Sequence, residues 1–211
     1  MGHKETVYEG ILKGNMEAVQ DATNAGLSDG LSAGVLLNEA MIPAMAEVGR
    51  LFETNEYYVP EMLIAARAMK AGLAILRPQL VQEDIKPIGR VAVGTVKGDL
   101  HDIGKNLVGI MLEGAGFEIV DLGVDVSPEV FIDVVRNQNV DIVGLSALLT
   151  TTMPSMKTTI EAFEKAGLRD QVKIIIGGAP VTQRYADEIG ADGYGRDAAA
   201  AANLAKELMG I

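Results

Sequence analysis

The spacing of apolar positions changes once along this chain, and the change divides it into two parts. From about residue 4 to residue 82, apolar residues recur at intervals of three and four, which is typical of amphipathic helices. After residue 90, short Val- and Ile-rich runs alternate with amphipathic segments, which indicates strands alternating with helices. A polar segment with a proline and a glycine, residues 82–89, separates the two patterns. We therefore predict a helical domain over residues 1–84 and an α/β domain over residues 85–211.

The apolar pattern of the helical part predicts four helices. The connections between them are short, which favours antiparallel packing of neighbouring helices. The third helix has the clearest apolar stripe, and Pro43 inside it should kink or break it. The fourth helix has Pro60 in its first turn, where the missing N–H does little harm. We expect a four-helix bundle whose helices cover residues 7–12, Met16–Ala25 with Gly26 as the stop, Leu37–Phe52, and 60–80.

Four methionines of this region, Met41, Met45, Met62 and Met69, fit two interpretations. Methionine packs well into irregular gaps, so the four side chains could simply fill the core of the bundle. Alternatively, one edge of the bundle could present soft apolar side chains to a flat ligand.

The second part predicts five strands, each followed by a helix, and hence parallel β-α-β units. Five such units indicate a flavodoxin-like, Rossmann-type sheet with strand order 2-1-3-4-5, in which ligands bind at the carboxyl ends of strands 1 and 3. One face of the first of these helices is expected to consist of Ile103, Leu107, Ile110, Met111 and Gly114. The expected strands are Arg90–Val96, Phe117–Leu122, Asp141–Leu145, Val172–Ile176 and Asp192–Tyr194; the expected helices begin near 103, 128, 153, 182 and 198.

The turn after the first strand carries the most unusual chemistry. Of two histidines in the chain, only His101 is internal, and it lies in this turn between Gly98 and Gly104. A neutral imidazole is a good ligand for a transition metal, and Asp99, two positions away, could hold its other ring nitrogen. The alternative is an ordinary surface histidine in a loop.

The glycines of this turn do not form a nucleotide-binding loop. A Walker A loop has four residues between its glycines and continues with Gly-Lys-Ser/Thr, whereas five residues separate Gly98 from Gly104 and Asn106 follows Lys105. A dinucleotide fingerprint, G-x-G-x-x-G, is also absent because Gly94, Gly98 and Gly104 are too widely spaced.

Two further turns are expected at the same edge of the sheet. The third strand leads into a hydroxyl-rich segment, Ser146–Thr152, and the fourth leads into Gly177 and Gly178, where backbone can approach a bulky group. Each feature alone could be ordinary turn and cap chemistry. Their shared location favours a binding site.

Composition narrows the range of functions. The net charge of -11 argues against nucleic acid as a partner, since phosphate contacts need clustered Lys and Arg. The chain has no cysteine, which excludes disulfides, thiolate catalysis, iron–sulfur clusters and Cys-based zinc sites. It starts without an apolar signal core, and no run approaches the roughly 20 apolar residues of a membrane span. We therefore expect a cytoplasmic protein with no membrane partner.

The three turns together resemble the motifs of cobalamin-binding domains. Asp99–Gly104 resembles their D-x-H-x-x-G motif, Ser146–Leu148 resembles the S-x-L after strand 3, and Gly177–Gly178 resembles their later G-G. In the helical part, Val48–Phe52 and Tyr58–Met62 are similar to the cap that precedes such domains. The resemblance covers nearly the whole chain and is to the stand-alone corrinoid proteins of methyltransferase systems and the cobalamin module of methionine synthase.

The resemblance implies roles for individual residues. His101 displaces the benzimidazole and binds cobalt through Nε2 as the lower axial ligand, Asp99 accepts from its Nδ1–H, and Thr152 completes the relay. Ser146 and Thr150 contact the displaced nucleotide tail. The glycine pair lines the channel for that tail, and the helical cap shields the upper corrin face. The implied cofactor-binding residues are Gly98, Asp99, His101, Asp102, Ile103, Gly104, Ser146, Leu148, Thr150, Thr152, Gly177 and Gly178.

The implied function is that of a methyl carrier that is not catalytic alone, because cobalt supplies the chemistry and nothing in the chain could activate a methyl donor. A substrate-specific methyltransferase would load it, and a second methyltransferase would pass the methyl group to tetrahydrofolate or a similar acceptor. A reductive activase is a further expected partner. Residues 82–89 would act as a hinge when the cap moves.

Two rival functions remain open at this point. A cobalamin-dependent sensor would share the cofactor, although such regulators usually carry a DNA-binding domain and this chain has no basic helix. A phosphoacceptor receiver domain shares the flavodoxin-like fold, but it needs an Asp after strand 3, where this chain has Ser146.

Overall fold

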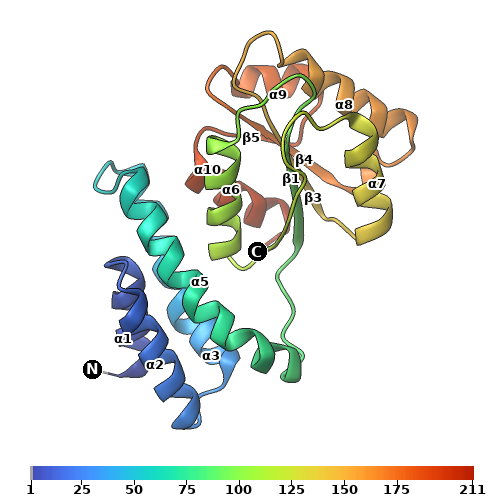
Figure 1. The fold of residues 1–211 in the computed structure, drawn as a ribbon. Helices are drawn as coiled ribbons and strands as arrows, with labels where there is room; N and C mark the ends of the chain where they lie inside the picture. The colour runs from blue at the N-terminus through green and yellow to red at the C-terminus, as the bar shows by residue number, and fades with distance from the viewer. Residues whose placement is uncertain (1) are drawn as a thin grey trace. The chain divides into compact units, whose positions relative to one another are not determined.

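The structure is a computed structural model that describes residues 2–211 (Figure 1). It contains two compact units, one formed by Met1–Pro87 with Gly114–Gly116 and the other by Ile88–Glu113 with Phe117–Ile211. The first unit is helical, and the second contains a parallel sheet with helices on both faces.

The helical unit has four helical stretches, as its apolar periodicity predicts. Its methionines Met41, Met45, Met62 and Met69 are all buried, with at most 2% of their surface exposed, so they are core residues rather than an exposed apolar edge. The stretches are α1 (His3–Leu12), α2 (Met16–Ser28), a composite of α3 (Ala33–Leu36), the π-helical turn η1 (Leu37–Met41) and α4 (Ile42–Glu53), and finally α5 (Val59–Gln82).

The break expected at Pro43 takes the form of the π-helical turn η1. This turn ends at Met41, and Pro43 is the second residue of α4. In a regular α-helix the proline ring collides with the carbonyl four residues earlier and leaves it without a donor. A widened turn with i to i+5 bonding relieves this conflict. The helix therefore continues through Pro43 instead of stopping there.

The prediction that Gly26 ends the second helix is wrong. Helix α2 continues to Ser28, and Gly26 is buried inside it. A Cβ at this position would lie 3.3 Å from the side chains of Leu31 and Leu36. Glycine here permits close packing, and the chain leaves the helix at Gly30, whose φ is +88°.

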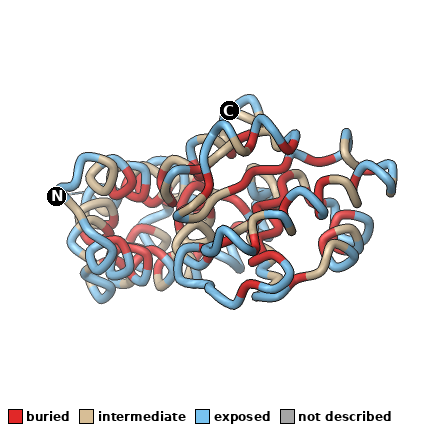
Figure 2. The backbone as a smooth tube through the Cα atoms, turned by 90° about the horizontal axis from the view of Figure 1, so that it is seen from above, coloured by how far each residue is buried: buried red, intermediate tan, exposed pale blue. Residues whose placement is uncertain are grey.

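The α/β unit has a five-stranded parallel sheet with the predicted order, β2-β1-β3-β4-β5. The central strands are almost continuously buried, whereas the edge strand β2 is half-exposed. Figure 2 colours the backbone by burial, with buried residues in red and exposed residues in pale blue. The strands are β1 (Arg90–Thr95), β2 (Glu118–Asp121), β3 (Ile142–Ser146), β4 (Lys173–Gly177) and β5 (Gly193–Gly195). The helices are α6 (Ile103–Gly114), α7 (Pro128–Gln138), α8 (Pro154–Lys165), α9 (Gln183–Ile189) and α10 (Ala198–Leu208), with a 3-10 turn, η2 (Arg169–Gln171), before β4.

Helices cover both faces of this sheet. Helix α6 lies on one face, and α7 and α8 lie on the other (Figure 1). The core under α7, α8 and α9 joins Phe131, Phe163 and Ile189 to the strand residues Val143 and Ile174. Burial on both faces explains why these strands are continuous apolar runs rather than alternating ones.

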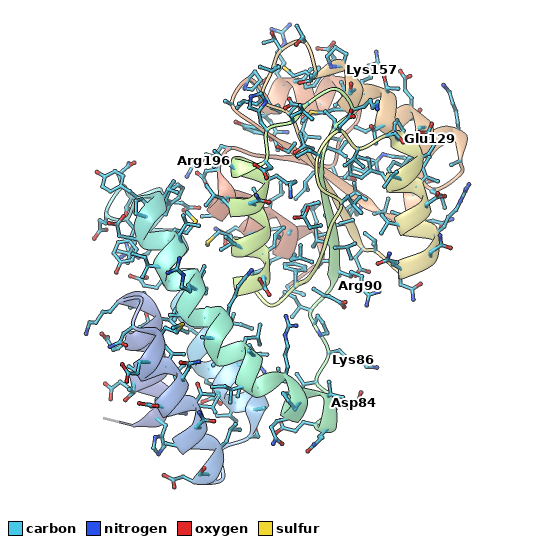
Figure 3. All side chains as sticks on the ribbon, viewed as in Figure 1. Asp84, Lys86, Arg90, Glu129, Lys157 and Arg196 are labelled. Carbon is cyan, nitrogen blue, oxygen red and sulfur yellow. The ribbon has the colours of Figure 1, made fainter. Side chains whose placement is uncertain are left out.

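The register brings the carboxyl ends of four strands to one level. Thr95 at the end of β1 is aligned with Ser146 of β3, which is aligned with Gly177 of β4, and Gly177 with Gly195 of β5. Arg90 marks the opposite end of β1, and Figure 3 shows it far from Lys157 in the first turn of α8. The turns singled out in the sequence therefore leave the sheet at a common edge.

The segment that joins the two units is partly anchored. Both oxygens of the Glu83 carboxylate accept hydrogen bonds, from the backbone N–H groups of Ala33 at 2.9 Å and Gly34 at 3.0 Å. The Asp84 and Lys86 side chains are exposed on this segment (Figure 3). Glu83 thus fixes the end of α5 to the start of α3.

Candidate functional site

The turn after β1 places His101 at the carboxyl edge of the sheet. The turn begins with Gly98, whose φ of +85° favours glycine, and Asp99 N–H donates to the carbonyl of Val96 at 3.1 Å. Helix α6 begins at Ile103, directly after the turn. The chain turns here because the apolar strand ends at Thr95 and Gly98 then adopts a backbone conformation that other residues rarely take.

Asp99 and His101 are in direct contact. Oδ1 of Asp99 lies 2.7 Å from Nδ1 of His101 and 3.0 Å from its backbone N. Because an ionised carboxylate only accepts hydrogen bonds, Nδ1 carries the proton and donates it to Asp99. In the neutral ring, Nε2 then has a free lone pair, and no hydrogen bond reaches it from residues 2–211. Half of the imidazole surface is exposed, 50%, so this nitrogen is accessible to a ligand.

The Asp99 carboxylate is fully buried and is surrounded by donors. Its Oδ2 accepts from Thr152 Oγ1 at 2.6 Å and from the N–H groups of Leu148 at 2.8 Å and Leu149 at 3.4 Å. Burial alone raises the pKa of Asp99, but the hydrogen bonds from Thr152, His101 and Leu148 outweigh it and hold the pKa well below its usual range. Asp99 is therefore an anion at neutral pH and fixes the tautomer of His101.

Thr152 fits this position with its methyl group as well as its hydroxyl. The residue is buried, and its Oγ1 also lies 2.9 Å from the carbonyl of Leu149. Its Cγ2 points toward Gly98, where even an added Cβ would remain 3.8 Å away. The structure thus brings together Asp99, His101 and Thr152, three residues that come from two turns.

The glycine pair after β4 is required by the protein's own packing. A Cβ on Gly178 would lie 1.9 Å from the carbonyl oxygen of Ala147, and the φ of this residue is +133°. A Cβ on Gly177 would lie 3.0 Å from the carbonyl of Gly195. These contacts explain both glycines without a ligand, so the expected role in lining a channel stays a prediction.

The remaining expected residues lie around the same edge. Ser146 ends β3, Thr150 is exposed in the following loop, and Asp102 accepts from Asn106 Nδ2 at 3.1 Å. Gly104 lies in the first turn of α6, where a Cβ would have no atom within 4 Å. All are placed within the two turns or directly beside them.

Four apolar side chains are exposed in the turns that follow β1 and β3. Leu100 is 72% exposed, Ile103 75%, Leu148 43% and Leu149 42%. Ile103 begins α6 and is exposed, whereas Met111, predicted on the same helix face, is buried. Such exposed apolar residues are typical of surfaces that bind a partner or ligand.

Sequence reasoning missed three residues that hold the turn. Thr95 Oγ1 donates to the carbonyl of His101 at 2.8 Å, Asp125 Oδ1 accepts from the N–H of Gly98 at 2.8 Å, and Ser155 Oγ donates to the carbonyl of Lys97 at 2.9 Å. The one available signal is Thr95, a hydroxyl residue at the end of an otherwise apolar strand.

The site offers a metal one ligand, the His101 imidazole, so it suits a metal whose other ligands come from a cofactor. Among the described residues, no group of three or more His, Cys, Asp or Glu side chains could hold a bare metal ion. His101 offers one nitrogen beside an apolar surface, and its orientation is set by a buried carboxylate. A flat, apolar metal chelate that lacks one axial ligand fits these residues. No helix in residues 2–211 is long and apolar enough to cross a membrane.

Comparison with known proteins points in the same direction. Two family models, each described as a B12 binding domain, match residues 89–203 and residues 4–77. The chain is 42% identical over 203 residues to trimethylamine corrinoid protein 2 of Methanosarcina acetivorans, covering 95% of this chain and 94% of that protein.

Solved structures give the same result. A cobalamin-binding protein from Desulfitobacterium hafniense superimposes with a TM-score of 0.82 at 31% identity, covering 97% of this chain and 98% of that one. A chain of the methanol:cobalamin methyltransferase complex from Methanosarcina barkeri gives a TM-score of 0.86 at 27% identity, covering 99% of this chain and 80% of that one.

Proposed function

Because the chain belongs to the B12-binding corrinoid proteins of methyltransferase systems, we propose that it binds cobalamin with His101 as the lower axial ligand and carries a methyl group between two methyltransferases. The observation that supports this most is the contact between Asp99 and Nδ1 of His101, which leaves Nε2 free on a half-exposed ring. The cofactor's own base would be displaced by this nitrogen.

The residues of the chain would hold the cofactor and orient His101, while bound cobalamin would supply a cobalt that takes a methyl group from a donor and gives it to an acceptor. Asp99 keeps the proton on Nδ1 of His101 and so presents Nε2 with its lone pair. Thr152 and the amides of Leu148 and Leu149 keep Asp99 ionised and hold its orientation. Through Asp99, this buried network fixes the direction of the imidazole.

The exposed apolar side chains of the two turns would support the corrin, and the hydroxyls after β3 would contact the nucleotide tail. Leu100, Ile103 and Leu148 offer the exposed apolar surface on which a flat macrocycle can lie. Ser146 and Thr150 supply hydroxyls for the displaced nucleotide tail. Further contacts are assigned to Gly98, Asp102, Gly104, Gly177 and Gly178.

The proposed partners are methyltransferases on either side of the carrier. Relatives include trimethylamine and dimethylamine corrinoid proteins, and one structural neighbour belongs to a methanol:cobalamin methyltransferase complex. A methylated amine or methanol is therefore the donor class to test first. The acceptor enzyme would use tetrahydrofolate or a related carrier, and a reductive activase would restore the reduced cofactor.

The axial role of His101 is tested by electron paramagnetic resonance of the protein reconstituted with cob(II)alamin. The chain has two histidines, so His3→Ala is a matched control for His101→Ala. With ¹⁵N-histidine in the protein, we expect the nitrogen splitting of cobalt to change from a triplet to a doublet in the wild type and in His3→Ala. His101→Ala should lose it. A triplet that ignores the isotope would show that the cofactor's own base is still bound.

A further inference from the structure

Two residues outside the recognised motif hold the backbone that carries His101. Thr95 is the last residue of β1, and Asp125 lies in the loop between β2 and α7. Neither was expected to contact a cofactor, and both bond to the turn rather than to the imidazole. We call Thr95 and Asp125 the turn frame.

Thr95 fixes one end of the His101 residue. It is fully buried, and its Oγ1 donates to the carbonyl of His101 at 2.8 Å. At the other end, the N–H of His101 donates to Asp99 Oδ1 at 3.0 Å. The backbone of Thr95 is itself hydrogen-bonded on both sides: its N–H donates to the carbonyl of Gly123 at 3.0 Å, and its carbonyl accepts from the N–H of Val126 at 2.9 Å. Both polar backbone groups of His101 are therefore bonded to buried side chains, those of Thr95 and Asp99.

Asp125 fixes the start of the turn from two sides. Its Oδ1 accepts from the N–H of Gly98 at 2.8 Å, and its own N–H donates to the carbonyl of Asp99 at 2.9 Å. Lys97 Nζ lies 3.2 Å from Oδ1 of the same carboxylate. Asp125 adopts this geometry with a φ of +53°, a left-handed conformation that Asp tolerates better than most residues but at some cost.

We propose that the turn frame holds His101 in its ligating position before the cofactor arrives, so that Thr95 and Asp125 are positioning residues for axial ligation. This inference rests on the proposed role of His101. A turn that became ordered only on binding would lose conformational entropy at that moment, which weakens affinity. The frame removes that loss by ordering the turn during folding.

A purely structural role would have a different signature. Thr95→Val is close to isosteric and removes only the hydroxyl, which leaves the carbonyl of His101 without its donor. Thr95→Ser keeps the hydroxyl. The matched control is Thr23→Val in α2, since Thr23 is also fully buried and donates to a backbone carbonyl, that of Val19, at 2.6 Å.

Ligation is measured in the protein reconstituted with cob(II)alamin. We expect Thr95→Val to raise the dissociation constant about tenfold and to reduce the share of cobalt with histidine nitrogen splitting. Thr95→Ser and Thr23→Val should retain the wild-type share. A dissociation constant within about twofold of the wild type and an unchanged nitrogen splitting in Thr95→Val would overturn the proposal for this residue.

Asp125 is tested with a pair of variants that separates its side chain from its backbone conformation. Asp125→Asn keeps an acceptor for Gly98 N–H and tolerates the left-handed φ, whereas Asp125→Gly tolerates the φ but removes the acceptor. We expect Asp125→Asn to ligate like the wild type and Asp125→Gly to lose nitrogen splitting. Equal ligation by the two variants would overturn its positioning role.

Hydrogen exchange of the cofactor-free protein separates this inference from the proposed function. The frame predicts protected amides at Asp99 and His101 in the wild type and faster exchange in Thr95→Val, with no change in Thr23→Val. Unchanged exchange would refute the frame. A wild type that binds cobalamin without histidine nitrogen, with the frame variants still altering exchange, would refute the axial role of His101 alone.

Discussion

Oδ2 of Asp99 lies 2.6 Å from Oγ1 of Thr152, a residue 53 positions later in the chain, and the contact is buried. The bond joins the turn after β1 to the loop after β3, and those two strands are neighbours in the sheet. Because Asp99 also holds His101, the orientation of the imidazole depends on a hydroxyl from a different loop.

Removing that hydroxyl should destabilise the cofactor-free protein. Thr152→Val keeps the shape of the side chain but deprives a buried carboxylate of a short hydrogen bond, which costs about 1–3 kcal/mol of unfolding free energy. Thr152→Ser should lose much less, because the hydroxyl remains. Urea unfolding followed by circular dichroism measures both. Equal midpoints for the valine variant and the wild type would show that water replaces the hydroxyl without cost.

The cost of Thr152→Val should depend on pH. The folded pKa of Asp99 is lowered, so the stability that its bonded carboxylate contributes is fully present above the unfolded value of about 3.9 and is lost as pH falls through the folded pKa. Asp99 has the same pKa in both unfolded chains, so the difference in unfolding free energy between wild type and Thr152→Val depends only on the two folded pKa values. Loss of the Thr152 bond raises the folded pKa of Asp99, so this difference should be constant near neutral pH and should shrink in acid as Asp99 becomes protonated in the folded variant. A difference that grows as pH falls would contradict this assignment.

Gly178 and Gly104 should respond in opposite ways to alanine. At Gly178, a Cβ would overlap the Ala147 carbonyl at 1.9 Å with φ at +133°, so Gly178→Ala should cost more than about 3 kcal/mol. At Gly104, nothing lies within 4 Å of a Cβ and the residue is helical, so Gly104→Ala should stabilise the cofactor-free protein by up to about 1 kcal/mol. Thermal unfolding of the two variants tests this pair. If Gly178→Ala were as stable as Gly104→Ala, the ends of β3 and β4 would have to move apart at little cost.

The architecture of the α/β unit could be predicted from sequence because its signals are local and repeated. The first strand was expected over Arg90–Val96 and is found over Arg90–Thr95, and the third was expected over Asp141–Leu145 and is found over Ile142–Ser146. Each strand is an apolar run between turn residues, and the strand order follows from five such runs. The π-helical turn before Pro43 was not predicted, because the apolar period shows where a helix is interrupted but not how it adjusts.

The parts of the site that could be predicted are contacts between side chains that lie close together in the sequence. His101 and Asp99 are two residues apart, so their contact could be predicted from chemistry alone, while Thr152 was identified only by resemblance. Thr95 and Asp125 could not be found in this way, because their bonds go to backbone atoms of the turn, and backbone groups leave no trace in a sequence. Periodicity places Ile103 and Met111 on one helix face, but it does not predict that this face is exposed at Ile103 and buried at Met111.

The segment between the units should pivot over fewer residues than the polar stretch 82–89 suggests. Glu83 receives two backbone N–H groups at the start of α3, and the side chain of Ile85 occupies the space beside Gly34, where an added Cβ would lie 2.3 Å from its Cδ1. Motion between the units would therefore be confined to Lys86–Ile88. Glu83→Ala leaves two helix N-terminal donors unpaired and should cost about 1–2 kcal/mol in unfolding of the helical unit.

Lys86→Ala is the matched control, because Lys86 is exposed on the same segment. Hydrogen exchange should show faster exchange at Ala33 and Gly34 in Glu83→Ala and not in Lys86→Ala. Limited proteolysis should extend from Lys86 toward residue 82 only in the Glu83 variant, because only there is the anchor lost. If the wild type is already cleaved throughout 82–89, the Glu83 bonds do not restrain the segment, and the whole stretch acts as the pivot.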